Sequence, residues 1–171
     1  VIKIVEDVLL NDINPDLVNT ISSFNAVAEP VTARNKNGIL KVTKSINPNL
    51  GFVADPEEID DEKLKSIINS NKVPVIAPMG LGENNQVYNI NADTAAGTIA
   101  IKIKAERLLL MTDVPGVKDE KGSYISKLTI LEAQKLIDNQ TITGGMIPKI
   151  QTCISAIKNG VGGVVIIDGT R

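Results

Sequence analysis

The stretch from Val73 to Gly97 constrains the fold of this chain more tightly than any other part of the sequence. Its first five residues form an apolar run rich in β-branched side chains, which predicts a buried strand. A proline and a glycine break that run, and Asn89, Asn91 and Asp93 then follow at alternate positions before a segment of small residues. Because side chains alternate across a strand, these three polar groups are predicted to share one face where a strand gives way to a helix.

Asp93 has two interpretations. A carboxylate directly before Thr94 and a run of small residues is typical of a helix N-cap, which is the commonest structural use of such a residue. The same junction favours an anionic ligand, because the first backbone N–H groups of a helix have no partner within that helix. The local pattern leaves both interpretations open.

Upstream of this stretch, the sequence predicts three helices and a β-hairpin, and Asp60 is expected to cap the third of these helices, Asp61–Asn69. Apolar residues in the first ten positions follow a helical period, and Asn14 followed by Pro15 is typical of the N-cap and first position of a second helix. The apolar runs 26–31 and 39–43 flank a loop that contains an Asn-Gly pair, which favours a tight turn between two strands.

From Val73 onward the predicted strands alternate with helices. Strands are expected near 73–77, 107–111 and 163–167, and helices near 94–106, 130–139 and 146–159, the second of these behind a Thr-x-x-Glu capping box. The first of these helices also shows an alternation of isoleucines that fits a strand. The order predicts an α/β fold with a parallel or mixed sheet covered on both faces, in which ligands bind at the carboxyl ends of the strands.

Composition excludes several kinds of site. The sequence has no histidine and one cysteine, Cys153, so it cannot form a Cys/His zinc site, a Ser-His-Asp triad or an internal disulfide. The single cysteine fits a reducing, cytoplasmic location. A net charge of -2 gives no basic excess for nucleic acid, and no apolar run approaches the roughly 20 residues that span a bilayer. Chemistry must therefore use carboxylates, lysines, amides and the backbone.

Two glycine-containing segments are candidate nucleotide sites. The segment Asp113-Val-Pro-Gly-Val117 follows a predicted strand, and its glycine would let a nucleotide approach the backbone, although an ordinary turn explains the pattern on its own. The second segment, Thr143-Gly-Gly-Met-Ile-Pro-Lys149, leads into a helix. A lysine in a first helical turn is disfavoured by the helix dipole, which indicates either an anion such as phosphate or a solvated surface lysine.

Four motifs in this order resemble the amino acid kinase family. They are Val73-Pro-Val-Ile-Ala-Pro, Tyr88-Asn-Ile-Asn-Ala-Asp-Thr-Ala-Ala-Gly, Leu110-Met-Thr-Asp-Val-Pro-Gly-Val and Thr141-Ile-Thr-Gly-Gly-Met-Ile-Pro-Lys, and Val165-Ile-Ile-Asp-Gly also fits. Each motif alone is weak, but the ordered combination is specific. Within the family, it is most similar to the kinases that act on N-acetylglutamate.

The resemblance implies transfer of the ATP γ-phosphoryl group to the side-chain carboxylate of N-acetyl-L-glutamate, the second step of arginine biosynthesis, with Mg²⁺ neutralising the phosphates. It implies catalytic roles for Lys149 and Asp93 and substrate contacts from Asn89 and Asn91. It assigns no metal-ligating residue. The nucleotide contacts that it implies come from Asp113, Val114, Pro115, Gly116, Val117, Thr141, Ile142 and Thr143.

The resemblance also implies a three-layer αβα sandwich with a mostly parallel central sheet, present here in part. Residues 1–77 are expected to be the C-terminal part of an amino-acid-substrate and dimerisation domain, and 78–171 a truncated nucleotide-binding domain. The family's phosphate loops would precede residue 1, so this chain alone is expected to be inactive. A homodimer or higher homo-oligomer and arginine as a feedback ligand are expected, with no nucleic-acid or membrane partner.

Two alternatives stay open at this point. Other members of the family phosphorylate glutamate (glutamate 5-kinase), aspartate or carbamate on the same fold. A chain with this fold can also be a non-catalytic nucleotide-binding or regulatory module.

Overall fold

The structure, a computed structural model, describes residues 1–34, 38–45 and 47–170. It divides into two compact units, Val1–Ala95 and Ala96–Arg171. The first unit contains α1 (Ile2–Asp7), the π-helical turn η1 (Val8–Ile13), α2 (Asn14–Ser23), β1 (Val27–Val31), β2 (Leu40–Lys44), η2 (Pro48–Leu50), β3 (Ala54–Ile59), α3 (Asp61–Asn69), β4 (Lys72–Ile76), β5 (Met79–Leu81), η3 (Glu83–Asn85) and β6 (Val87–Asn89). Helix α4 (Ala92–Lys102) begins in it, and β7 (Leu108–Thr112), α5 (Ile130–Asp138), α6 (Met146–Lys158) and β8 (Val164–Asp168) follow in the second unit.

The boundary between the two compact units falls between Ala95 and Ala96. The division expected after residue 77, between a substrate domain and a nucleotide-binding domain, stays a prediction. Strand β5 pairs with β2, and β6 pairs with β5, so both strands belong to the sheet of the first unit. The hydrogen-bonded ladder therefore keeps β5 and β6 in the first unit.

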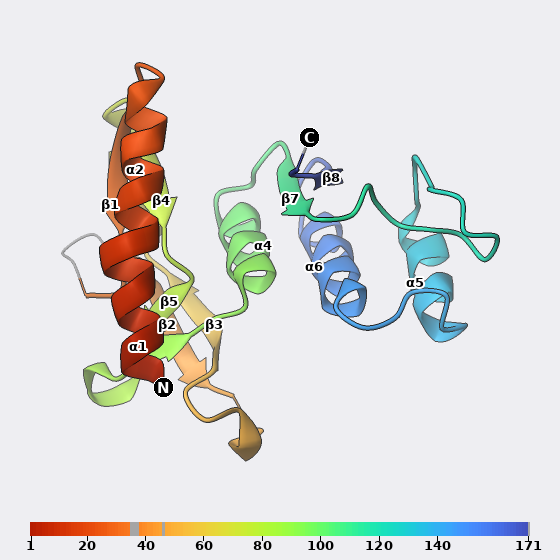
Figure 1. Ribbon diagram of the computed structural model, residues 1–171, viewed down its shortest axis with the longest axis horizontal. Coiled ribbons are helices and arrows are strands. Elements are labelled where there is room, and N and C mark those ends of the chain that lie inside the picture. Colours follow the sequence, from red (N-terminus) through yellow and green to blue (C-terminus); the bar gives the residue numbers. More distant parts are fainter. Residues whose placement is uncertain (35–37, 46, 171) are drawn as a thin grey trace. The chain divides into compact units, whose positions relative to one another are not determined.

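One long helical run opens the first unit, and Figure 1 shows α1 and α2 as a single continuous coil. The prediction that Asn14 caps a separate helix is wrong, because Ile13 and Asn14 both have α-helical backbone angles. The Asn14 N–H donates to the Leu9 carbonyl, five residues back. A π turn of this kind accommodates the ring of Pro15, which would clash with a carbonyl in a regular α-helix.

The predicted hairpin between 26–31 and 39–43 is also wrong. Strand β1 pairs in parallel with β4, whereas β2 pairs antiparallel with β3 and parallel with β5. The parallel β1–β4 pairing buries Val31 and Val75, and long-range burial of this kind overrides a local turn signal. The Asn-Gly turn itself lies partly outside the described residues.

The helical run packs against the strands of the first unit. Helix α2 contacts β1 and β4, and α1 contacts β6. The side chain of Asn14 is buried, and its Nδ2 donates to the carbonyl oxygen of Val75 at 2.8 Å. Apolar side chains of α1 and η1 cover Met79 and Val87, which are almost fully buried. The helix therefore fixes the positions of β4, β5 and β6.

The second unit is built on the parallel pair β7–β8. Helix α6 packs against β8, and one core joins Leu108 and Leu110 of β7 to Ala100 and Ala156 from helices α4 and α6. The helix predicted near 94–106 is confirmed as α4. Three of the five strand pairs in the described ranges are parallel, so the predicted α/β class with a mostly parallel sheet is confirmed.

Several local predictions are confirmed at the helix ends. The Asp60 carboxylate accepts the Lys63 N–H at 3.0 Å and caps α3. Thr129 and Glu132 form a reciprocal capping box on α5, and the Thr129 N–H donated to the Glu132 carboxylate lowers the pKa of that carboxyl group. Across the described ranges, no helix combines the length and the apolar character that crossing a bilayer requires.

Gly97→Ala should destabilise the second unit. Helix propensity alone would favour alanine by up to about 1 kcal/mol. The new Cβ, however, would lie 2.5 Å from Cγ2 of Thr152, and overpacking costs about 1–3 kcal/mol. Since a β-branched threonine is stiff at χ1, we expect a net loss of about 1–2 kcal/mol in the free energy of unfolding, measured by urea denaturation.

The companion variant removes the clashing methyl group. Gly97→Ala combined with Thr152→Ser should recover most of the lost free energy. Equal losses in the single and the double variant would show that close packing of α4 on α6 is not the reason for this glycine.

Candidate functional site

Asn89 lies at the end of β6 in the first unit. Its N–H donates to the carbonyl oxygen of Phe52 at 2.9 Å, and Val53 forms an isolated parallel bridge with it. Its side chain is half-buried. The backbone of Asn89 is thus held from both sides, by β5 through the ladder and by the chain segment that precedes β3.

The N-cap of α4 is formed by Asn91, and the prediction that Asp93 caps this helix is wrong. Oδ1 of Asn91 accepts the Thr94 N–H at 3.1 Å and the Thr94 hydroxyl at 3.3 Å. Asp93 follows inside the first helical turn, where a carboxylate interacts favourably with the helix dipole. The extended segment therefore ends at Asn91, and the three polar residues do not alternate along one strand.

In the second unit, the carboxyl ends of β7 and β8 are direct neighbours. Thr112 is opposite Asp168 in the parallel register, and the Gly169 N–H donates to the Thr112 carbonyl at 2.8 Å. The Thr112 hydroxyl donates to Oδ1 of Asp113 at 3.2 Å. The predicted nucleotide turn Asp113–Val117 thus begins beside the turn that Asp168 opens.

The two predicted nucleotide segments share one core. Val117 and Ile142 are both buried, at 6% and 3% exposed, and both belong to the apolar cluster that contains Ile150 and Ile154 of α6. The structure therefore brings the turn 113–117 and the loop 141–143 together within the second unit. Asp113, Pro115 and Thr143 are exposed, while Val114, Gly116 and Thr141 are half-buried.

Helix α6 begins at Met146 and has no side-chain cap. The Met146 N–H donates to the Thr143 carbonyl at 3.3 Å, and Gly144 has a left-handed φ of 57°. A Cβ placed on Gly144 or Gly145 would meet nothing within 4 Å. The helix therefore begins in open space, with two glycines in place of bulky side chains.

Lys149 lies in the first turn of α6, at the same edge of the second unit as the turns that follow β7 and β8. The 13 residues of α6 span about 20 Å, slightly more than the length of β8, and a short connection joins the two elements. The helix packs on β8 and runs back along it, so its first turn lies towards the carboxyl end of the strand. The side chain of Lys149 is half-buried.

A hollow of about 400 Å³ opens in the same unit. It is bounded by Pro115, Gly116 and Val117 of the predicted nucleotide turn, by one face of α6 and by β8. Most of the other side chains that line it are aliphatic. This is the chemistry expected of a pocket that takes a flat, largely apolar group and leaves polar recognition to a few groups at its rim.

The described part of the chain contains no group of three or more Asp, Glu or Cys side chains that could hold a metal ion. Sequence reasoning did not single out one feature of the site. Phe52 contacts Asn89 from a segment far away in the sequence, and no local sequence pattern predicts that contact. The turn at Asp168, in contrast, follows from the rule that parallel strands end at one edge.

Comparison with known proteins gives a consistent result along the whole chain. The model of the amino acid kinase family matches residues 10–168. Acetylglutamate kinase of Pelagibacter ubique is 47% identical over 170 residues, which cover 99% of this chain and 58% of that protein. Acetylglutamate kinase of Nitrobacter hamburgensis is 45% identical and covers 98% of this chain and 60% of that protein. The chain thus spans about three fifths of the length of these curated relatives.

A solved structure has the same fold. The crystal structure of smu.665 from Streptococcus mutans UA159 matches with a TM-score of 0.90 and 28% identity, over 98% of this chain and 67% of that one. A match of this quality supports the arrangement of elements within each unit described above.

Asn91→Ala should lower the free energy of unfolding by about 1 kcal/mol, because the first turn of α4 loses its capping oxygen. Asn91→Ser keeps an oxygen within reach and should lose much less. Urea denaturation of the two variants beside the wild type measures both effects. An alanine variant as stable as the wild type would mean that the Asn91 side chain does not act as a cap.

Proposed function

The chain belongs to the amino acid kinase family, and on that premise we propose that the whole protein transfers the γ-phosphoryl group of ATP to the side-chain carboxylate of N-acetyl-L-glutamate. The observation that carries this proposal is the 47% identity, over 99% of the chain, to a protein named acetylglutamate kinase. Residues proposed for both the acceptor and the nucleotide lie within that matched stretch.

The chemistry suits a chain without histidine. A side-chain carboxylate is ionised at neutral pH, so the acceptor is already a nucleophile and needs no general base. Phosphoryl transfer is accelerated mainly by positioning the two reactants and by stabilising the charge on the transferred group. Amides, a lysine and backbone N–H groups can supply both effects.

We propose that Asn89 binds the acetylated amino acid. Its backbone is fixed on both sides, so its amide presents a donor and an acceptor in a defined direction. Asn91 is proposed as a second contact. Since its Oδ1 already accepts two hydrogen bonds from Thr94, its contribution to the substrate would come from the Nδ2 donors.

Lys149 is proposed to stabilise the charge that develops on the transferred phosphoryl group. The open start of α6 and its dipole add positive potential in the same place. Asp93 is proposed to organise active-site lysines of the whole protein, and it does not need to take a proton. The nucleotide is proposed to contact Asp113–Val117 and Thr141–Thr143, which share one core through Val117 and Ile142.

Mg²⁺ is proposed as the metal ion of the reaction. In kinase sites, Mg²⁺ is held largely by phosphate oxygens and water, with one or two carboxylates. The absence of a larger acidic cluster from the described residues fits an ion that enters with the nucleotide. When bound, the ion neutralises part of the phosphate charge.

The proposal extends to the cellular setting. The reaction would be the second step of arginine biosynthesis and would take place in the cytoplasm, with arginine as a feedback ligand of the whole protein. A sequence with one cysteine, and so without an internal disulfide, suits a reducing compartment.

We further propose that the protein forms a homodimer or a higher homo-oligomer. The α1–η1–α2 run and the residue that follows it carry exposed apolar side chains, which are Ile4, Val8, Ile13, Leu17 and Phe24. The π turn makes the five-residue step from Val8 to Ile13 roughly one turn, so the stripe continues along one side of the run. A contiguous exposed apolar stripe is typical of a protein–protein contact.

The full-length protein should phosphorylate N-acetyl-L-glutamate with ATP and should be far less active on L-glutamate, L-aspartate and carbamate. Lys149→Ala should lower kcat about 100- to 1,000-fold, because one preorganised charge is lost from the transition state. Asp93→Ala should also lower kcat strongly. Coupled measurement of ADP release gives these rates.

Lys158→Ala is the matched control, because this exposed lysine lies in the last turn of the same helix. Its activity should stay within about twofold of the wild type, as expected for a surface charge. Activity on N-acetylglutamate that survives Lys149→Ala, or a preference for another acceptor, would refute the proposed site or the proposed substrate, respectively.

Leu17→Lys, alone or with Ile13→Lys, should shift the protein towards the monomer in sedimentation-velocity experiments, because a charge placed in an apolar contact is costly to desolvate. Leu131→Lys, at an 82% exposed leucine of α5, is the control and should leave the distribution unchanged. An unchanged oligomer in the Ile13/Leu17 variants would exclude the α1–η1–α2 stripe as the contact.

A further inference from the structure

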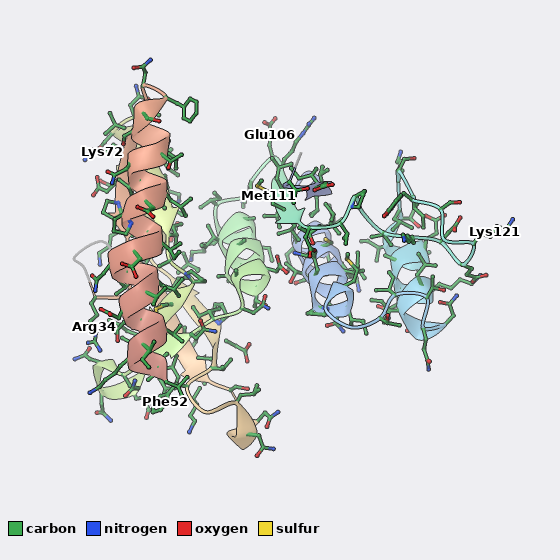
Figure 2. The ribbon with its side chains drawn as sticks, in the orientation of Figure 1. Arg34, Phe52, Lys72, Glu106, Met111 and Lys121 are labelled. Carbon is green, nitrogen blue, oxygen red and sulfur yellow. The ribbon has the colours of Figure 1, made fainter. Side chains whose placement is uncertain are left out.

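Phe52 is one of two phenylalanines in this chain, and its side chain is 47% exposed although the residue lies in the middle of a hydrogen-bonded segment. Figure 2 labels it in the first unit. The proposed function gives it no role. Its neighbours in space, in contrast, include the residue proposed to bind the acceptor substrate.

The segment that carries Phe52 is tied down at both ends. The Ser45 N–H donates to the Val53 carbonyl at 3.0 Å, which closes the loop between β2 and β3. Asn47 caps η2 by accepting the Asn49 N–H at 3.1 Å. Gly51 follows with a left-handed φ of 62°, a conformation that turns the chain and that glycine adopts without strain.

Phe52 and Val53 then meet Asn89 through the backbone. The Asn89 N–H donates to the Phe52 carbonyl at 2.9 Å, and Val53 bridges Asn89 in parallel. Strand β6 is only three residues long, and on its other side it pairs with an equally short β5. Two short strands hold a residue weakly, so the contact with the segment 52–53 supplies much of the constraint on Asn89.

The aromatic ring of Phe52 secures this contact. It packs against the ring of Tyr88, the neighbour of Asn89, with a centroid separation of 6.0 Å and an interplanar angle of 45°. This separation lies within the range of favourable aromatic pairs. Gly82 makes room for the tyrosine, because a Cβ there would lie 2.8 Å from Cε2 of Tyr88.

We infer that Phe52 is a positioning residue, which fixes Asn89 for the acceptor substrate by locking the segment 52–53 against β6 through its ring contact with Tyr88. The inference rests on the proposed function for the identity of the substrate. The structural link between Phe52 and Asn89 does not depend on the proposed function.

Two measurements on the full-length protein test the inference. In Phe52→Ala, hydrogen–deuterium exchange at the Asn89 amide should be about 3- to 10-fold faster, which corresponds to loss of one aromatic pair. In the same variant, the KM for N-acetyl-L-glutamate should rise by a similar factor, while the KM for ATP stays unchanged. Phe52→Tyr keeps the ring and should restore both values.

Leu50→Ala is the matched control, because Leu50 is an apolar side chain of the same segment with an almost equal exposed fraction of 48%. It should leave exchange at Asn89 and both KM values as in the wild type. If Leu50→Ala matches Phe52→Ala, the effect belongs to the loop in general and the inference is overturned. Unchanged exchange at Asn89 in Phe52→Ala would overturn it as well.

These experiments distinguish a failure of the proposed function from a failure of the inference about Phe52. A wild-type protein that is inactive on N-acetylglutamate would refute that function, whereas exchange at Asn89 would still report whether Phe52 holds the residue in place. Altered exchange with an unchanged KM for the acceptor would overturn the inference by itself, since Asn89 would then be fixed for some other reason.

Discussion

The parallel pairing of β7 with β8 is the constraint on which the proposed nucleotide site depends. Two parallel strands end at the same edge, so the turns that follow Thr112 and Asp168 become neighbours without any contact between their side chains being required. Helix α6 packs on β8 and runs in the opposite direction, which brings its glycine-rich start to that edge as well. Backbone geometry brings the two turns and the start of α6 together, and buried side chains such as Val117 and Ile142 hold the connecting loops in place.

Sequence reasoning succeeded where the signal and its partner lie within one turn of each other. The caps at Asp60 and Thr129 join residues three positions apart, so their spacing in the sequence is also their spacing in space. It failed where a residue far away in the sequence determines the local conformation. Asn14 has the pattern of an N-cap, but its amide bonds to Val75, 61 positions away, and the helix continues through it. The expected hairpin gave way to the β1–β4 pairing for the same reason.

In the candidate site, too, local features could be predicted from the sequence and long-range contacts could not. The residue types around Asn89, Asp93 and Lys149 could be selected from the sequence, because glycines, amides and a lysine at strand-to-helix junctions are recognisable patterns. The boundaries could not be fixed to one residue, and α4 therefore begins with Asn91 as its cap instead of Asp93. The role of Phe52 could not be predicted, because its direct link to Asn89 joins segments that are far apart in the sequence and has no counterpart in local spacing.

Because the chain has no histidine, the helix caps and glycines described above bear directly on the proposed catalysis. Under the proposed function the acceptor is already ionised and no proton has to be removed, so general acid–base catalysis would contribute little to the rate. The available means are distance, direction and charge. A cap that sets where α4 starts decides the direction of the Asp93 carboxylate. In the proposed site, the glycines that leave the start of α6 open would decide how closely a phosphate could approach the helix dipole. In a site of this kind, packing and capping residues contribute to catalysis through the geometry that they impose, and substitutions far from the reacting atoms should alter rate as well as stability.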